Sequence, residues 1–271
     1  MVTAAPDASA PPPWDELAQL VKSGDLAERA FVAGATRLRW WRDRDAGDRA
    51  RAVRLLEELR ARGVAEHADV RAAIRSGRLA GAELRGHIEA IAEDLRDSWV
   101  EEVFDVASPP MEEPAYERGL VPYVPSGVAE ILHAVDVSGV GPDQTLVDLG
   151  SGMGKVVMLA SLVSGARGLG IEIDPVLAQA SSEAASSLSL DRVRIVRGDA
   201  RHADLAQGDV FFMYLPFTGA PFDAVMKRIE EVATAKRVVV CAVAIDVRRF
   251  RWLSPRAAPS SWMQVYESAP G

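Results

Sequence analysis

The sequence predicts an α/β fold, in which a mostly parallel sheet flanked by helices follows an all-helical N-terminal domain. Three observations lead to this prediction. Residues 14–104 carry only helical patterns, whereas from residue 146 onward short apolar runs alternate with helical segments. The first of these apolar runs ends in a glycine-rich turn at 150–154. Strands that alternate with helices are joined by right-handed crossovers, and such crossovers make the sheet parallel.

Length and composition limit the class of protein. With 271 residues and 48% hydrophobic residues, the chain can build a sizeable core in one large or two small domains. Its net charge of −8 gives no basic footprint for a nucleic-acid backbone, so nucleic acid is not the expected partner. No apolar stretch reaches membrane-spanning length and no signal peptide is evident, so we expect a cytoplasmic protein without a membrane partner. The oligomeric state is left open.

The single cysteine, Cys241, lies in an apolar run, and it is expected to be a buried structural thiol rather than a nucleophile.

The N-terminal part divides into a leader and a helical domain. Residues 1–13 are rich in Ala, Pro and Ser and are expected to form a disordered leader. Residues 14–106 form the predicted helical domain. Within it, residues 23–25 are expected to end one helix and cap the next.

Two longer amphipathic helices are predicted in this domain. One covers residues 50–62 and is expected to stop at Gly63, and the other covers residues 80–103. His67 and His87 are expected to lie far apart on different helices, so we expect no metal site there.

A proline-containing linker at 107–110 begins the second domain, residues 107–271. The segment 116–127 carries two tyrosines, and two prolines keep its backbone extended. Ser126 is the predicted N-cap of the helix that follows. The segment can fold over a ligand as a lid, and a rigid connector is the alternative.

The glycine-rich turn is the most informative part of the sequence. An apolar run passes through Asp148 and continues into Gly150, Gly152 and Gly154, after which a helical pattern begins. Glycines at this spacing allow positive φ and let the backbone lie against a ligand. The turn therefore predicts a cofactor cradle at the carboxyl end of the first strand, where open α/β sheets bind ligands.

The glycine spacing separates the candidate ligands. A phosphate-binding P-loop requires Gly where this chain has Leu149 and Ser or Thr where it has Val156. The dinucleotide fingerprint is Gly-x-Gly-x-x-Gly, whereas this turn is Gly-x-Gly-x-Gly. A sharp strand–helix turn without any ligand is the structural alternative.

Six further strands are expected after the turn. The last two should pair antiparallel, which gives a seven-stranded sheet. The six strands are expected within residues 168–175, 192–200, 209–217, 237–243, 250–253 and 262–266.

Acidic residues lie at the ends of three of the seven predicted strands. Glu172 lies 18 residues after Gly154, where its carboxylate can accept hydrogen bonds from both ribose hydroxyls of an adenosyl ligand. Asp199 can accept from the adenine amino group while the amide of Ala200 faces the ring. Each acid can also be an ordinary helix cap. Together with Asp148, however, they predict an acidic, phosphate-free pocket that suits a sulfonium cation.

These residues resemble motif I and the following motifs of the class I S-adenosylmethionine-dependent methyltransferases, which have a Rossmann-like fold. The resemblance covers residues 116–271 and implies S-adenosyl-L-methionine as the cofactor. It implies no metal. The cofactor-binding residues that it implies are Asp148, Gly150, Ser151, Gly152, Gly154, Glu172, Asp199, Ala200 and Tyr214.

The fourth strand ends where class I enzymes place residues that flank the transferred methyl group. Amino-group methyltransferases often carry Asn/Asp-Pro-Pro-Tyr/Phe there. This chain keeps Pro216 and Phe217 but has Tyr214 and Leu215 in the first two places, which argues against adenine or amide methylation. Tyr214 and Tyr123 are the candidate catalytic residues, because either phenol can assist proton removal from an amine.

The acceptor is predicted from a narrower resemblance. The segment 121–126, Glu172 and residues 214–217 are similar to the seven-strand (non-SET) protein-lysine methyltransferases. We therefore expect methylation of a protein amino group. The alternatives are an O- or N-methyltransferase of a small molecule, with the helical domain as roof of its pocket, and a non-catalytic adenosylmethionine-binding protein. An aminopropyl transferase would require a further pair of acids that the sequence does not show.

Overall fold

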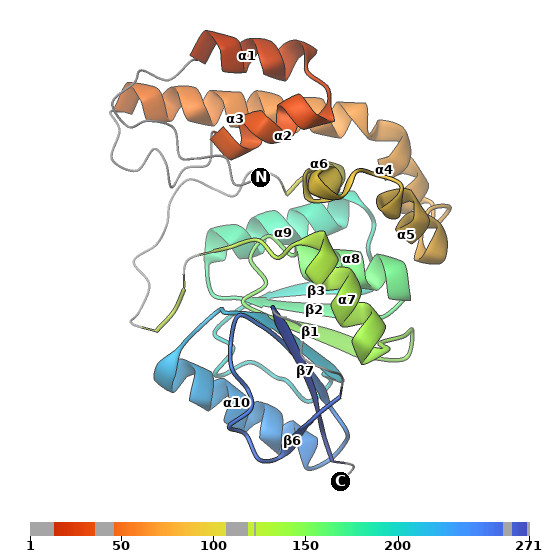
Figure 1. The fold of residues 1–271 in the computed structure, drawn as a ribbon, viewed down its shortest axis with the longest axis vertical. Helices are drawn as coiled ribbons and strands as arrows, with labels where there is room; N and C mark the ends of the chain where they lie inside the picture. Colours follow the sequence, from red (N-terminus) through yellow and green to blue (C-terminus); the bar gives the residue numbers. More distant parts are fainter. Residues whose placement is uncertain (1–13, 36–45, 107–118, 122, 257–261, 270–271) are drawn as a thin grey trace.

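The structure is a computed structural model that describes residues 14–35, 46–106, 119–121, 123–256 and 262–269 (Figure 1). The leader predicted for residues 1–13 and the linker predicted at 107–110 lie outside the described residues. No helix within these ranges is long and apolar enough to cross a membrane.

The N-terminal part is helical, as predicted. Its helices pack above the sheet in the view of Figure 1. They are α1 (Trp14–Ser23), α2 (Leu26–Ala35), α3 (Ala46–Glu66), α4 (Ala68–Arg75), α5 (Gly81–Glu89), the 3₁₀ turn η2 (Glu93–Leu95) and α6 (Arg96–Phe104).

The expected boundary between the first two helices is confirmed. Asp25 and Glu28 form a reciprocal cap, in which the amide of each residue donates to the carboxylate of the other at 2.9 and 3.0 Å. This capping box satisfies amides that the first turn of α2 leaves unpaired.

Two other helix predictions were wrong. Helix α3 continues through Gly63 to Glu66. Gly63 is needed for packing rather than for ending the helix, because a β-carbon there would lie 2.8 Å from Cγ of Glu102. The single helix expected over 80–103 is divided into α5, η2 and α6. At the break, the Arg96 guanidinium donates to the carbonyls of Glu89 and Ile91, which the interrupted helix leaves unpaired.

The second part carries the sheet. In chain order its elements are α7 (Val128–Ser138), β1 (Thr145–Leu149), α8 (Lys155–Ser164), β2 (Arg167–Glu172), α9 (Pro175–Ser187), β3 (Val193–Arg197), β4 (Val210–Tyr214), α10 (Gly219–Ala233), β5 (Val239–Val243), β6 (Leu253–Pro255) and β7 (Met263–Ser268).

The sheet has seven strands in the order β3-β2-β1-β4-β5-β7-β6. Strands β1 to β5 pair in parallel, and β7 is antiparallel to both β5 and β6. The predicted Rossmann-like sheet and its antiparallel end are confirmed. The strand order reverses between β1 and β4, and their carboxyl ends therefore bound a crevice of the kind in which open α/β sheets bind ligands.

Each face of the sheet has its own hydrophobic core. Helices α7 and α8 cover one face, where Val157 and Met158 are fully buried, and α10 covers the other with Val225 and Met226 (Figure 1). Cys241 on β5 is buried, and burial raises the pKa of its thiol to about 12, as expected for a structural cysteine.

The two predicted domains share a core. Leu84 and Ile88 of α5 and Val100 of α6 belong to the same buried cluster as the residues of α8. A third, smaller cluster lies among α1, α2 and α3. Helix α5 packs against α8 and helix α6 against α7, and these two helices cover one face of the sheet.

Candidate active site

A cavity opens at the carboxyl ends of β1, β2 and β4. The cavity is open to solvent on one side, and both polar and apolar side chains line it. Of the ten predicted site residues, Gly152 and Gly154 are not on its wall. The other eight line it: Tyr123, Asp148, Gly150, Ser151, Glu172, Asp199, Ala200 and Tyr214.

The glycine turn has the predicted backbone. Gly150, Gly152 and Gly154 have φ values of 85°, 51° and 76°, which L-residues rarely adopt. The turn is also enclosed on both sides. A β-carbon at position 152 would lie 2.1 Å from the ring of Tyr123, and one at position 150 would lie 2.6 Å from Cβ of Pro216. Only glycine fits at either position.

Glu172 fastens the turn to the second strand. Its two carboxylate oxygens accept hydrogen bonds from the amides of Gly152 at 2.7 Å and Asp174 at 2.8 Å. The side chain is buried, and burial raises its pKa although these amides favour the ionised form. Carboxylate oxygens have further lone pairs, so Glu172 can still accept from a ligand.

Asp148 is the most deeply buried acid of the cavity. Burial, and then the nearby charge of Glu172, raises the pKa of Asp148 well above its ordinary range. Two carboxyl groups in one buried wall favour a cationic ligand, because a positive charge lowers the cost of ionising both.

Ser151 provides a further indication of a ligand. Its hydroxyl oxygen is buried and has no hydrogen-bond partner among the described residues, although the residue lines the cavity. Buried polar atoms are rarely unpaired, and a polar ligand group would satisfy this one. The orphaned hydroxyl, the buried acids and the glycine cradle together fit S-adenosylmethionine, which carries a sulfonium, hydroxyls and an amino group.

Asp199 lines the cavity but already has partners. Its carboxylate accepts from the amide and the guanidinium of Arg201, with an ion pair at 2.6 Å. Burial alone would raise the pKa of Asp199, but the hydrogen bonds and charge of Arg201 hold it below its ordinary value. Turns and then β4 follow Asp199, so it does not cap a helix as the sequence allowed, and a ligand would share its oxygens with Arg201.

The segment before α7 lines the cavity. Leu120 pairs with Phe217 in an antiparallel bridge, the Val121 amide donates to the Pro216 carbonyl at 3.2 Å, and the Thr218 amide donates to the Gly119 carbonyl. The end of β4 thus holds the described residues of this segment, which we call the lid, in the cavity wall.

Ser126 was wrongly predicted to cap α7. It is buried in the cavity wall, and the N-cap is Gly127. The amide of Val128 donates at 2.9 Å to the Asp97 carboxylate of helix α6. A carboxylate from another helix has therefore taken the place that the local sequence pattern assigned to Ser126.

The end of β4 is strained. Leu215, a non-glycine residue, has φ 39°, and its amide donates to the carbonyl of Val243 on β5. Strained backbone of this kind persists where the surrounding structure fixes it and is often found at functional sites. Tyr214, directly before it, is half-buried in the cavity wall.

The sequence analysis missed Lys155, which follows Gly154 and lines the cavity. Its ammonium is buried and bonded to Asp97 at 3.0 Å and Glu101 at 2.7 Å, both on α6. Burial alone would lower the pKa of Lys155, but the two carboxylates raise it. A positive charge in the first turn of a helix is unfavourable, because the helix dipole is positive at that end. The position of Lys155 was therefore the one feature of the sequence that could have indicated acidic partners on another element.

No group of three metal-ligating side chains lies within the described parts of the chain. The expectation that His67 and His87 are far apart was wrong, because both rings pack against Trp99, with centroid distances of 5.7 and 5.2 Å.

Comparison with known proteins shows a family match within this region. Residues 123–209 match the family described as "Histone methylation protein DOT1". The match begins at the lid tyrosine and includes the glycine turn, Glu172 and Asp199. No curated protein matches the chain.

Several solved structures are similar to part of the chain. An RNA methyltransferase from Salinibacter ruber, in complex with S-adenosyl-L-homocysteine, is 26% identical over 54% of this chain and 92% of that one, with a TM-score of 0.45. A geranyl diphosphate C-methyltransferase from Streptomyces coelicolor is 21% identical over 43% and 44%, with a TM-score of 0.39. A methyltransferase from Geobacter sulfurreducens, also with S-adenosyl-L-homocysteine, is 22% identical over 42% and 47%, with a TM-score of 0.36.

The observations on the site agree with one another. A parallel sheet with a switch point carries a Gly-x-Gly-x-Gly turn, and buried acids face this turn from the ends of the neighbouring strands. The same stretch matches a histone methylation family. The chain is a class I S-adenosylmethionine-dependent methyltransferase.

Proposed function

We propose that this methyltransferase transfers the methyl group to an amino group of a protein, of the lysine type. The observation that carries the proposal is the match of residues 123–209 to a histone methylation family. The matched stretch includes Tyr123 of the lid as well as the cofactor turn, whereas the end of β4 lies beyond it.

The cofactor side of the site is assigned as follows. Glu172 would accept from the ribose hydroxyls, and Asp199 with the Ala200 amide would hold the adenine ring. Asp148, Ser151 and the backbone of the glycine turn would hold the remaining polar groups. S-adenosylmethionine, when bound there, supplies a methyl group activated by its sulfonium.

The acceptor side is formed by the lid and the end of β4. Leu120, Val121 and Phe217 give an apolar wall that suits the methylenes of a lysine side chain. Tyr123 and Tyr214 also line the cavity, and either one, as a phenolate or by passing its own proton on to water, can take a proton from the acceptor ammonium so that the neutral amine can attack. The protein itself has a net charge of −8, which favours encounter with a basic protein.

The composition of the cavity wall argues against the small-molecule alternative. A small-molecule enzyme with the helical domain as roof would have residues of α1 to α6 in the cavity wall. Among the described residues, those that line the cavity all lie between 120 and 217. The described parts of α1 to α6 therefore contribute nothing to its wall.

The test is methyl transfer from labelled S-adenosylmethionine to a mixture of basic proteins. A second sample has its lysines acetylated beforehand, and a third contains only metabolites of low molecular mass. We expect label in the first sample alone, recovered as methyl-lysine by mass spectrometry. Label in the acetylated sample or in the metabolites would contradict the lysine assignment, and label in none would favour a protein that only binds the cofactor.

Tyr214→Phe tests the acceptor side separately. Because the phenol is placed beside the acceptor, its loss should lower kcat by about 10²-fold or more while the dissociation constant for S-adenosylhomocysteine stays within about twofold. The matched control is Tyr266→Phe, a buried tyrosine on β7 outside the cavity wall. A Tyr214 variant that lost cofactor affinity but kept kcat would contradict the assignment.

A further inference from the structure

Helix α6 belongs to the N-terminal helices, yet two of its acidic side chains contact Lys155, a residue of the cavity wall. Asp97 and Glu101 lie one helical turn apart, and both bond the ammonium of Lys155. Lys155 is the residue after Gly154, so this contact fixes the end of the glycine turn. The ammonium is almost fully buried, with the Lys155 side chain 4% exposed, and a buried charge has to be paired.

Asp97 makes a second contact with the other wall of the cavity. The same carboxylate oxygen that bonds Lys155 accepts the amide of Val128, the first residue of α7. Val128 lies directly after the lid segment, and Ser126 of that segment lines the cavity. One carboxylate of α6 thus joins the glycine turn to the base of the lid.

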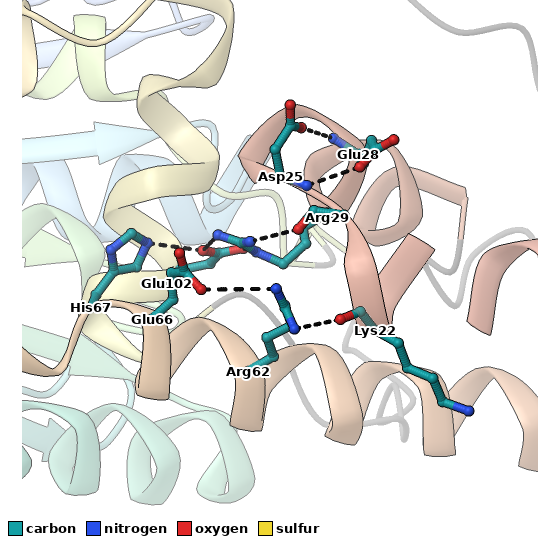
Figure 2. Close-up of polar contacts among 9 residues, drawn as sticks. Lys22, Asp25, Glu28, Arg29, Arg62, Glu66, His67 and Glu102 are labelled. Atoms are coloured by element: carbon teal, nitrogen blue, oxygen red, sulfur yellow. Dashed lines mark hydrogen bonds and ion pairs between the residues drawn. The ribbon is translucent and has the colours of Figure 1, made fainter. Parts of the chain in front are cut away.

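The opposite side of α6 is held by the helical part. Glu102 is buried and accepts two hydrogen bonds from Arg29 of α2, at 2.8 and 2.9 Å, and pairs with His67 at 3.0 Å (Figure 2). Gly63 leaves the space for this carboxylate. Consecutive residues of one helix therefore face two different charge clusters, with Glu101 toward the glycine turn and Glu102 toward α2 and α3.

We propose that Asp97 and Glu101 are positioning residues for the cofactor, and that α6 is the element through which the N-terminal helices set the geometry of the active site. Asp97 holds the glycine turn and the lid in register, and Glu101 completes the pairing of Lys155. Neither residue lines the cavity, so both act through Lys155 and Val128.

The experiment measures binding of S-adenosylhomocysteine by calorimetry, together with KM for S-adenosylmethionine, in variants of the full chain. Asp97→Ala removes both contacts, and we expect the dissociation constant to rise about tenfold. Asp97→Asn keeps an acceptor oxygen for Val128 but removes the charge, so a smaller increase is expected. Both variants should raise KM for the cofactor more than they lower kcat.

Asp136→Asn is the matched control. Asp136 of α7 pairs with Arg85 of α5, so this pair also joins the helical part to α7, but neither residue lines the cavity. We expect its cofactor affinity to equal that of the wild type. An equal loss of affinity in Asp136→Asn and Asp97→Ala would overturn the proposal, because loose docking of the helices would then be the cause.

A double-mutant cycle keeps the test independent of folding defects in the alanine variant. Glu101→Gln and Asp97→Asn are isosteric and should leave the melting transition cooperative. Combined with Lys155→Met, each change should lose most of its effect on cofactor affinity, because the partner is gone. Fully additive effects on affinity, or unchanged affinity in both single variants, would contradict the proposal. Since the readout is cofactor binding, the result does not depend on which acceptor is methylated.

Discussion

The buried carboxyl groups of the cavity destabilise the ligand-free folded protein and favour the binding of a cation. The raised pKa of Asp148 means that the folded protein binds this proton more tightly than the unfolded chain. In the pH range between the ordinary and the raised value, the folded state holds more protons. Its stability therefore falls as the pH rises through the raised pKa. Asp148 is thus a place where the fold gives up stability for a cation site.

Asp148→Asn should reverse this effect. We expect the free energy of unfolding of the ligand-free protein at neutral pH to rise by about 0.5–2 kcal/mol, and the melting temperature to depend less on pH. Cofactor affinity should fall at the same time. Thermal melts over a series of pH values, from acidic to mildly alkaline, check the first claim. A less stable variant with an unchanged pH profile would show that burial of the Asp148 carboxyl does not destabilise the folded protein.

Glu172 carries the ribose assignment. Glu172→Ala should weaken S-adenosylhomocysteine binding by about 1–3 kcal/mol, because buried hydroxyl donors lose their acceptor. The same change frees the Gly152 amide, so the glycine turn loses its anchor as well. Glu183→Ala is the control, since Glu183 is exposed on α9 and bonds only Gln179 in the described structure. Calorimetry that finds equal affinity in both variants would disprove the assignment.

At the scale of elements, the glycine turn and the lid are in close contact. The ring of Tyr123 occupies the space that any side chain at Gly152 would need. This contact joins the candidate catalytic tyrosine to the backbone that cradles the cofactor. A change on either side should therefore disturb both.

Gly152→Ala tests this coupling. The positive φ costs about 1–2 kcal/mol for an L-residue, and the new methyl group must also displace the Tyr123 ring. We expect loss of both stability and cofactor binding, measured by thermal melts and calorimetry. Gly86→Ala on α5 is the control, because nothing lies within 4 Å of a β-carbon there, and alanine should stabilise the helix slightly. Wild-type affinity in Gly152→Ala would contradict the close fit between turn and lid.

The elements of the site could be predicted because their signals are local. Three glycines, an acid at each strand end and the alternation of strands with helices are all visible in short windows of sequence. The pairing of Lys155 with Asp97 was not visible, because 58 residues separate them and only packing of α6 on α8 brings them together. The predictions for Gly63 and Ser126 were wrong for the same reason. Gly63 is set by its contact with Glu102, and Ser126 by its place in the cavity wall, rather than by local sequence preference.

At the scale of the whole molecule, the buried cluster around Glu102 unites the N-terminal helices. Burial alone would raise the pKa of Glu102, but His67 and Arg29 lower it below its ordinary value. The stability that this acid contributes is present above its unfolded pKa and is lost as the pH falls through its folded pKa. The cluster is therefore one place where acid should loosen the helical part.

Glu102→Ala should destabilise the protein by about 3–5 kcal/mol, because it leaves the buried charge of Arg29 without its partner. Urea denaturation measures the change. Arg85→Ala is the control, since the Arg85 pairs lie at the surface and should contribute about 1 kcal/mol or less. Similar losses in the two variants would mean that the Glu102 cluster does not hold the helices together.

The central claim is that the cavity beside the glycine turn binds S-adenosylmethionine for methyl transfer. Its most direct test is a calorimetric titration of the full chain with S-adenosylhomocysteine, repeated with NAD. We predict binding of one adenosylhomocysteine per chain, weakened in Glu172→Ala, and no binding of NAD. Binding of NAD instead, or of neither ligand, would contradict the assignment of the turn, the acids and the activity together.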